Sequence, residues 1–245
     1  GKAAGNIDDG DKNGLMSAVH GLDKTKGLDL VLHTPGGDLG ATESIVHYLR
    51  TIFEDDIRVF IPQIAMSAGT MIACASKVIF MGKESNIGPI DPQFGGIPAH
   101  GVLDEFERAL NAVKTDPLSL PIWQTIVGKY HPTFLGECEN AINLSSELVE
   151  AWLVEIMFKG EEGAKEKAAA IVKSLNNHSD TKMHSRHIHF QEAQAMGLKI
   201  NMLEEDQQLQ DCVLTLHHAY MHTLGNTTAI KIIENHEGRA MVINI

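Results

Sequence analysis

Basic runs, long apolar stretches and paired cysteines are all scarce in this sequence. Lys and Arg number 20 against 32 Asp and Glu, so the net charge is −12 and a nucleic-acid partner is not expected. No apolar stretch approaches the roughly 18 residues that cross a bilayer, and the first residues lack a signal-peptide pattern. The cysteines, without CxxC spacing, predict neither a disulfide framework nor a zinc knuckle. We therefore expect a soluble, cytoplasmic protein without cofactor or metal, associated with a membrane only if an upstream segment is missing.

The chain is long enough for one large domain, because 245 residues that are 43% hydrophobic can bury a substantial core. We predict a single domain over residues 1–245. Its parts are an α/β core at about 27–98, a helical part at about 99–175, and a C-terminal helix and hairpin at about 186–245. The opening GKAAGNIDDGDKNG is polar and Gly-rich, which predicts a loop or a flexible arm.

Apolar runs alternate with amphipathic stretches from Leu28 onward, a pattern typical of parallel βαβ units. Buried strands are predicted at 28–33, 56–62 and 77–81, with helices over 38–53 and 67–76 between them. Helical periodicity dominates after Pro98, over 101–114, 122–130, 135–158 and 161–175. A polar HEG turn between 229–234 and 240–245 predicts a β-hairpin.

Three short motifs at strand ends are the candidates for chemistry. His33–Asp38 (HTPGGD) has two glycines that let backbone N–H groups face a negative charge near a helix N-terminus. Ala65–Thr70 (AMSAGT) places Ser67 between a strand and a helix, a geometry that suits a nucleophile. Ile87–Gln93 (IGPIDPQ) has two prolines around Asp91, which fix a rigid turn. Taken singly, the motifs are equally a plain turn, an N-cap serine and a structural corner.

The order of the three motifs resembles the ClpP/crotonase superfamily, and within it the serine dehydrogenase proteinase family, a relative of signal peptide peptidase A. The likeness continues to Glu192-Ala193 and Gly197-Leu198, which match an "EA…GL" helix, and it runs from Leu28 to about Asn244. It implies ClpP/crotonase-like stacked βαβ units with a mostly helical second half. It further implies a homo-oligomer, because relatives assemble into rings or stacks.

The resemblance also implies an activity and a set of site residues. The activity is that of a serine endopeptidase, a hydrolase that cleaves peptide or protein substrates through an acyl-enzyme. No residue identifies the substrate. The implied site comprises the nucleophile Ser67, an oxyanion hole formed by the N–H groups of Gly37 and Ala68, and a substrate groove at Gly36, Gly88, Pro89 and Asp91.

The general base departs from the family pattern. The histidine that ClpP carries after the third strand is absent, and no acid stands at His184 and Ser185, where the resemblance places the third triad member. We predict that His184 accepts the Ser67 proton, with His100 and Lys114 as alternatives, because a lysine would need a large decrease in pKa. A less favoured interpretation is a metal site formed by His178, His184, His187 and His189.

Two other functions fit the same fold. A crotonase-like acyl-CoA enzyme uses paired N–H groups as an oxyanion hole without a serine nucleophile. A catalytically inactive protein with the peptidase fold would bind peptides or subunits. Ser67 within MSAGT favours the peptidase over the acyl-CoA enzyme, which does not need it, and the lack of an ordinary triad is the main support for the inactive protein.

Overall fold

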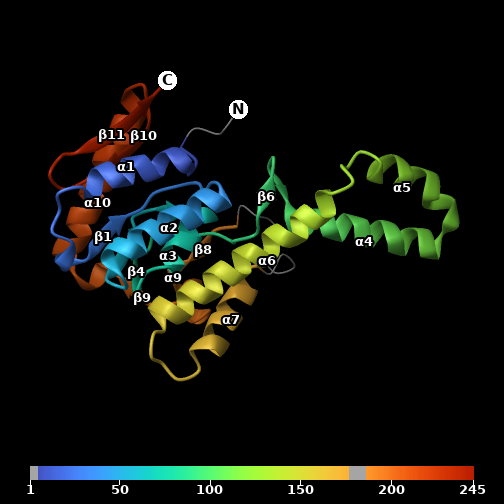
Figure 1. The fold of residues 1–245 in the computed structure, drawn as a ribbon, viewed down its shortest axis with the longest axis horizontal. Helices are drawn as coiled ribbons and strands as arrows, with labels where there is room; N and C mark the ends of the chain where they lie inside the picture. The colour runs from blue at the N-terminus through green and yellow to red at the C-terminus, as the bar shows by residue number, and fades with distance from the viewer. Residues whose placement is uncertain (1–4, 177–185) are drawn as a thin grey trace.

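The computed structural model describes residues 5–176 and 186–245, and its centre is a parallel sheet (Figure 1). The strands run in the order β1-β2-β4-β9, and each neighbouring pair is parallel. The α/β class and the three predicted strands are confirmed, whereas β9 was not predicted. The strands are β1 (Leu28–Val31), β2 (Ile57–Ile61), β4 (Val78–Met81) and β9 (Ile200–Met202).

A second, smaller sheet carries the segment before Ser67. Its strands are β3 (Ile64–Ala65), β5 (Asn86–Ile87) and β8 (Ile188–His189), in the order β3-β5-β8. β3 is parallel to β5, whereas β8 is antiparallel to it. The three strands are so short that backbone pairing with one another fixes their position more than any propensity does. A further hairpin consists of β6 (Gln93–Phe94) and β7 (Ile97–Pro98).

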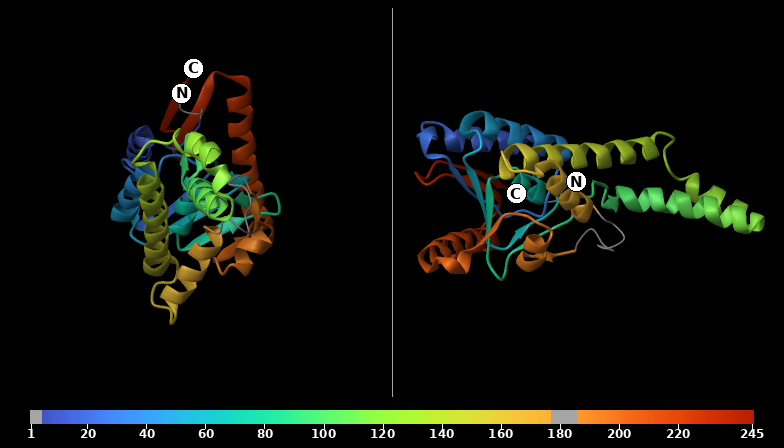
Figure 2. Two further views of the ribbon diagram at one scale, coloured as in Figure 1. Left: turned by 90° about the vertical axis from the view of Figure 1, so that its right-hand side faces the viewer. Right: turned by 90° about the horizontal axis from the view of Figure 1, so that it is seen from below.

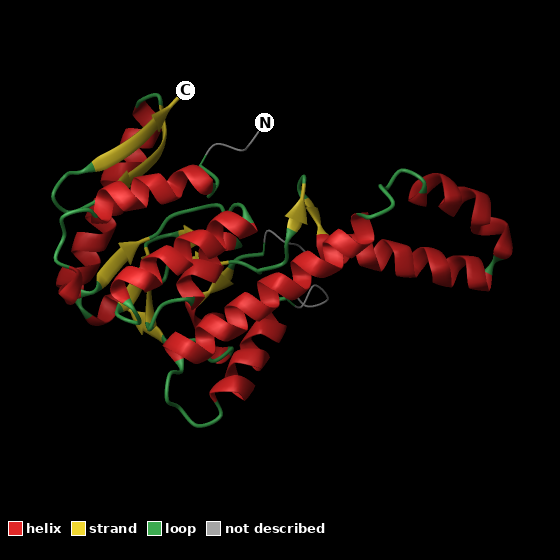
Figure 3. Ribbon diagram, viewed as in Figure 1, coloured by secondary structure: helices red, strands yellow, loops and turns green. Residues whose placement is uncertain are grey.

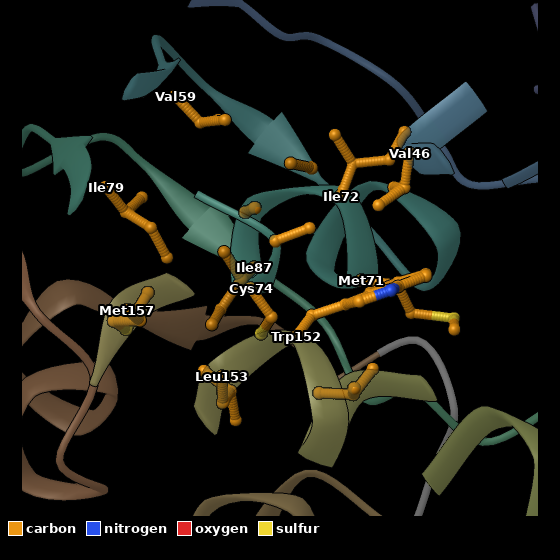
Figure 4. Close-up of a cluster of buried hydrophobic side chains, with 14 of the residues drawn as sticks. Val46, Val59, Met71, Ile72, Cys74, Ile79, Ile87, Trp152, Leu153 and Met157 are labelled. Atoms are coloured by element: carbon orange, nitrogen blue, oxygen red, sulfur yellow. The ribbon is translucent and has the colours of Figure 1, made fainter. Parts of the chain in front are cut away.

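Helices cover the main sheet and bury its apolar side chains. In α2 (Leu39–Phe53), Asp38 caps the first turn by accepting the Ala41 N–H at 2.9 Å, and Ile45 and Leu49 face the core. The close-up in Figure 4 shows Cys74, Trp152 and Met157 among the buried side chains of this core. The other helices of this core are α3 (Ala68–Cys74), α6 (Phe134–Trp152), which continues as a π-helical turn at Leu153–Met157, and α7 (Ala164–Leu175).

A long C-terminal helix, α10 (Gln207–Asn226), packs on the opposite face of the sheet. Val213 of α10 clusters with Phe60 and Leu203, next to the stacked rings of Phe60 and Phe80. Before it come the short helix α9 (Phe190–Ala195), which confirms a helix at the "EA…GL" segment, and a 3-10 turn at Leu203–Glu205.

Two helices form an arm that projects from the body (Figures 1 and 2). They are α4 (Ala99–Thr115) and α5 (Leu120–Val127), joined by a 3-10 turn at Pro117–Ser119. Figure 3 shows only helices and loops along the arm. No residue of α5 is buried, and Leu118 and Ile122 are 87% and 65% exposed. Trp123, Ile126 and Val127 of α5 are half-buried, whereas Leu118 and Ile122 leave apolar surface open on the arm.

The predicted loop at the start of the chain is wrong, because residues 9–19 form the helix α1 (Asp9–Val19). A capping box between Asp8 and Asp11 satisfies its first N–H groups. Gly14 lets the helix approach the C-terminal hairpin, since a Cβ there would lie 2.9 Å from Ile233 Cδ1. That hairpin, β10 (Ala229–Glu234) and β11 (Ala240–Asn244), confirms the prediction; a 3-10 turn at Lys24–Lys26 leads from α1 to β1.

Within residues 5–176 and 186–245, no helix has both the length and the apolar character needed to cross a membrane.

Candidate active site

Ser67 sits in a strained turn between β3 and α3. Its backbone has φ 48° and ψ −110°, and among the described residues Glu54 is the other non-glycine residue with positive φ. Such a conformation costs about 1 to 3 kcal/mol and persists only where the surroundings enforce it. The Ser67 side chain makes no capping hydrogen bond to the described part of α3. Ser67 thus occupies the N-cap position of α3, but its hydroxyl does not do the work of a cap.

Backbone and side-chain hydrogen bonds hold this turn. The Gly69 N–H donates to Met66 O at 2.8 Å, and the Met71 N–H donates to Ser67 O at 3.0 Å. The fully buried hydroxyl of Thr70 lies 2.8 Å from Ala65 O and 2.9 Å from Gly88 O, and it accepts the Gly88 N–H at 2.9 Å. Thr70 thereby fastens the Gly88–Pro89 turn to the Ser67 turn, a role that sequence reasoning missed.

The Gly36-Gly37 turn lies directly against Ser67. Gly36 has φ +112°, and a Cβ on it would lie 3.0 Å from both Met66 O and Ser67 Cβ. Glycine is required here because the conformation and the close approach both exclude a side chain. The buried Thr34 shapes the turn by accepting the Gly36 N–H on Oγ1 at 3.1 Å. The two motifs predicted to converge are thus in contact.

The N–H groups next to the predicted oxyanion donors donate hydrogen bonds that hold the two turns. The Asp38 N–H donates to Ile7 O at 2.9 Å, the Gly36 N–H to Thr34 and the Gly69 N–H to Met66. Within the described residues, the N–H groups of Gly37 and Ala68 take no part in these bonds. Ala68 also opens α3, where peptide dipoles favour negative charge. An oxyanion hole needs donors of this kind, and this role of the two N–H groups stays a prediction.

The Gly37 position has no room for a side chain. A Cβ at Gly37 would lie 2.6 Å from Ile7 Cα and closer still to the Ile7 carbonyl oxygen. Backbone atoms cannot move aside as a flexible side chain can. Any side chain at Gly37 would therefore push residues 6–8 away from the turn.

The predicted groove residues are all enclosed. Gly36, Gly88, Pro89 and Asp91 are buried, and the Ile90 N–H donates to Leu175 O at 3.2 Å. Asp91, 3% exposed, lies at the start of the arm, where its Oδ1 accepts the His100 N–H at 3.5 Å. Gly36 and Gly88 contact the Ser67 turn, and direct contact of the four residues with a substrate stays a prediction.

The three candidate bases occupy very different places. His184 and Ser185 lie outside the described residues. His100 is the second residue of α4, half-buried at the base of the arm. Lys114 is exposed in the last turn of the same helix, on the projecting arm (Figure 1). No described residue hydrogen-bonds to the Ser67 hydroxyl, so the base stays a prediction.

A pair of histidines lies behind the Gly36-Gly37 turn and was not predicted. The ring of His33 packs against His217 of α10, with 4.9 Å between the ring centroids. Burial lowers the pKa of His33. Burial, with smaller contributions from His33 and His218, lowers the pKa of His217 to about 4. Both rings are therefore neutral at neutral pH, and His33 faces α10. His33 and His217 lie far apart in the sequence, so no local pattern predicts that their rings meet.

We expect the buried His217 to make the fold less stable in acid. Between about pH 6.5 and pH 4 the unfolded chain binds a proton at His217 that the folded chain excludes, so stability is complete above this range and falls within it. Denaturant midpoints measured at about pH 7.5 and about pH 5 should differ by less in His217→Gln than in the parent. His236→Gln, at an exposed site, is the control. Equal pH dependence in parent and His217→Gln would contradict this prediction.

Other features of the described residues do not form a second site. The cysteines 74, 138 and 212 are free thiols, and burial raises the pKa of Cys74 to about 12. Within the described ranges no three His, Cys, Asp or Glu side chains group together as metal ligands. His187 and His189 are exposed, and the other two histidines of the alternative metal site lie outside those ranges. A surface hollow of about 610 Å³ lies on α4, remote in sequence from Ser67.

Two curated relatives come from the archaeon Methanocaldococcus jannaschii, and both are uncharacterized proteins. One is 30% identical over 210 residues, which cover 86% of this chain and 64% of the relative. The other is 36% identical over 110 residues, which cover 45% of this chain and 37% of the relative. The chain therefore spans less than two thirds of the length of the curated relatives it matches.

A family model supplies the more extensive match. The model of ClpP-like SDH-type serine proteinases matches residues 5–236, nearly the whole chain. The match includes the Gly36-Gly37 turn, the Ser67 turn and the Gly88–Pro89 turn, and it extends through α10 into the C-terminal hairpin. The predicted family and the ClpP-like fold are confirmed. The chain belongs to the family of ClpP-like serine proteinases of the SDH type.

Proposed function

We propose that this protein is a serine endopeptidase that cleaves peptide or protein substrates through an acyl-enzyme on Ser67. The observation that carries the proposal is the strained Ser67 turn, whose hydroxyl caps no helix and which touches the Gly36-Gly37 turn. A fold does not retain such strain at a serine for packing alone, because glycine would relieve it.

The chemistry follows from the placement of these groups. Ser67 Oγ attacks the scissile carbonyl carbon while a base takes its proton, and the carbonyl oxygen becomes an oxyanion. The N–H groups of Gly37 and Ala68 donate to that oxyanion. The carbon–nitrogen bond then breaks, the amine leaves with the proton, and water releases the acid from Ser67 by the same route.

Trapping the acyl-enzyme distinguishes this function from acyl-CoA chemistry. Acid quenching during turnover of a peptide ester should leave an acyl adduct on the tryptic peptide that contains Ser67. Turnover of an acyl-CoA without such an adduct would favour the crotonase-like enzyme. Binding of peptides without turnover or adduct would favour an inactive binding protein.

We infer that the general base is His184. The alternatives are His100 and Lys114. A histidine accepts a proton near neutral pH without the pKa decrease that burial must impose on a lysine. Labelling of Ser67 by a fluorophosphonate should then slow below about pH 6.5, the ordinary histidine value. We expect His184→Ala to label at least ~100-fold more slowly than the parent.

Parallel variants decide between the candidates. His100→Ala and Lys114→Met should label at close to the parent rate if His184 is the base. Parent-like labelling of His184→Ala, together with an inactive His100→Ala or Lys114→Met, would assign the base to α4. The site would then resemble the dyads of signal peptide peptidase A relatives.

We further propose that the protein is a homo-oligomer assembled through its arm. The apolar residues Leu118 and Ile122 stand exposed on the arm, and residues of this kind are concentrated in the cores of subunit interfaces. Light scattering at micromolar concentration should give a mass above the 26.7 kDa of one chain. Leu118→Asp with Ile122→Asp should lower that mass, whereas Leu216→Asp on α10 should not. A parent of monomer mass would contradict the proposal.

A further inference from the structure

The Gly36-Gly37 turn is held by a segment from the start of the chain. We call Asn6–Asp8 the Ile7 segment. The Ile7 N–H donates to Gly36 O at 2.8 Å, and the Asp38 N–H donates to Ile7 O at 2.9 Å. These two bonds lie on either side of the Gly37 residue in the sequence. The direction of the Gly37 N–H therefore depends on where Ile7 sits.

Lys231 of β10 fixes the Ile7 segment from the other end of the chain. Its ammonium Nζ donates to Asn6 O at 2.6 Å and to the two carboxylate oxygens of Asp11 at 2.7 and 3.0 Å. Asp8 Oδ2 lies 3.7 Å from the same nitrogen. The side chains of Lys231 and Asp11 are only 11% and 7% exposed. Solvent therefore screens this contact far less than it screens a surface ion pair.

Asp11 links Lys231 to the backbone of the Ile7 segment. Its Oδ2 accepts the Asp8 N–H at 2.9 Å and also accepts a hydrogen bond from the Lys231 ammonium. Without Lys231, two neighbouring carboxylates at the start of α1 would lack their shared cation. A buried charge that loses its partner is strongly unfavourable. The Ile7 segment would then move to expose Asp11 to water.

The hairpin that carries Lys231 is itself firmly placed. It packs on α1 (Figure 1). A Cβ on Gly14 of α1 would meet the side chains of Ile233 and Met241. The phenol of Tyr220 on α10 donates to Glu234 at 2.9 Å, at the end of β10. Lys231 thus projects from a rigid element, as a residue that positions another group must.

We propose that Lys231 is a positioning residue for the oxyanion hole. Through Asp11 and the Ile7 segment it sets the orientation of the Gly37 N–H, although it touches no reacting atom. The inference rests on the proposed function, because it assumes that this N–H stabilises the oxyanion. Loss of Lys231 should therefore slow the reaction of Ser67 without removing the nucleophile.

The test compares Lys231→Met with the parent in the full chain. Fluorophosphonate labelling of Ser67 should be at least ~10-fold slower, in the step that forms the Oγ–P bond rather than in initial binding of the probe. In hydrogen exchange, the amides of Ile7 and Asp38, whose bonds join the Ile7 segment to the turn, should exchange faster, whereas those of β2 should keep the protection of the parent. Lys159→Met removes an exposed ion pair with Asp55 and should change neither measurement.

Each outcome decides for or against the role of Lys231. Labelling and exchange that match the parent would overturn it. Slower labelling with equal loss of protection in β2 would also overturn it, because Lys231 would then stabilise the whole fold. If the parent is not labelled at Ser67, the proposed function fails, and faster or unchanged exchange at Asp38 still shows whether Lys231 holds the turn.

A milder variant decides the case in which Lys231→Met does not fold. Asp11→Asn keeps the side-chain shape and an oxygen that accepts the Asp8 N–H, but it loses the charge that faces Lys231. We expect several-fold slower labelling and faster exchange at Ile7 and Asp38. Parent-like values of both would overturn the proposal.

Discussion

Replacing Ser67 by alanine should abolish covalent labelling by a fluorophosphonate. In the parent, Ser67 Oγ forms a bond to phosphorus as fluoride leaves, and mass spectrometry of the digested protein should place the adduct on this residue. The expected loss is complete, because no second hydroxyl in the described structure combines a strained turn with an adjacent Gly-Gly turn.

Other nucleophiles provide the controls for this experiment. Ser119→Ala, on the arm, should label at the parent rate. The Ser76 hydroxyl is fully buried and donates to Ala73 O at 2.7 Å, and burial raises the pKa of the Cys74 thiol to about 12, so neither should react. An adduct on Ser44, Ser76 or Ser119 in the parent would refute the nucleophile assignment.

Replacing Gly37 by valine should lower turnover by about 10²- to 10³-fold, the loss typical of removing one oxyanion-hole donor. The added Cβ would run into Ile7 Cα at 2.6 Å, so the Gly36-Gly37 turn must move and carry the Gly37 N–H with it. Because residues 6–8 move as well, we also expect a lower denaturant midpoint. Turnover is measured on a peptide substrate at saturating concentration.

Gly136→Ala is the matched control for the Gly37 variant. A Cβ at Gly136 in α6 meets nothing within 4 Å, and alanine is a better helix former than glycine. Turnover should stay at the parent value, and the denaturant midpoint should not fall. Near-normal turnover in a folded Gly37→Val protein would refute the placement of the oxyanion hole.

Sequence patterns predicted the helices and strands that are stabilised by residues close together in the sequence. The helix α2 has its cap at Asp38 and an apolar stripe through Ile45 and Leu49, so its start and its buried face can both be read directly. By contrast, β9 is three residues long, has Asn201 at its centre, and exists because it pairs with β4. The helix α1 begins with DGDKNG, a poor helix former, and is stabilised by a capping box and by the C-terminal hairpin.

The same division applies to the candidate site. The two turns that carry Gly37 and Ser67 could be placed together because parallel strands bring their carboxyl ends to one edge of a sheet. Their supports could not, because Thr70 and Lys231 act through contacts with segments distant in the sequence. Thr34 and Thr70 did offer a local signal, since a hydroxyl beside a Gly-rich turn often bonds to the backbone. That signal does not say which segment the hydroxyl reaches. Lys231 offered none.

The separation of Lys231 from its partner in the sequence has a consequence for the timing of biosynthesis. Lys231 follows Asp11 by 220 residues, whereas Ser67 and the Gly-Gly turn leave the ribosome early. At about 5 to 20 residues per second, roughly 10 to 45 s pass between synthesis of the two ends of this contact. During that time the Gly36-Gly37 turn has a nucleophile beside it but no Lys231 to hold the Ile7 segment. On the proposed role of Lys231, the nascent chain therefore reaches full reactivity only when β10 has been made.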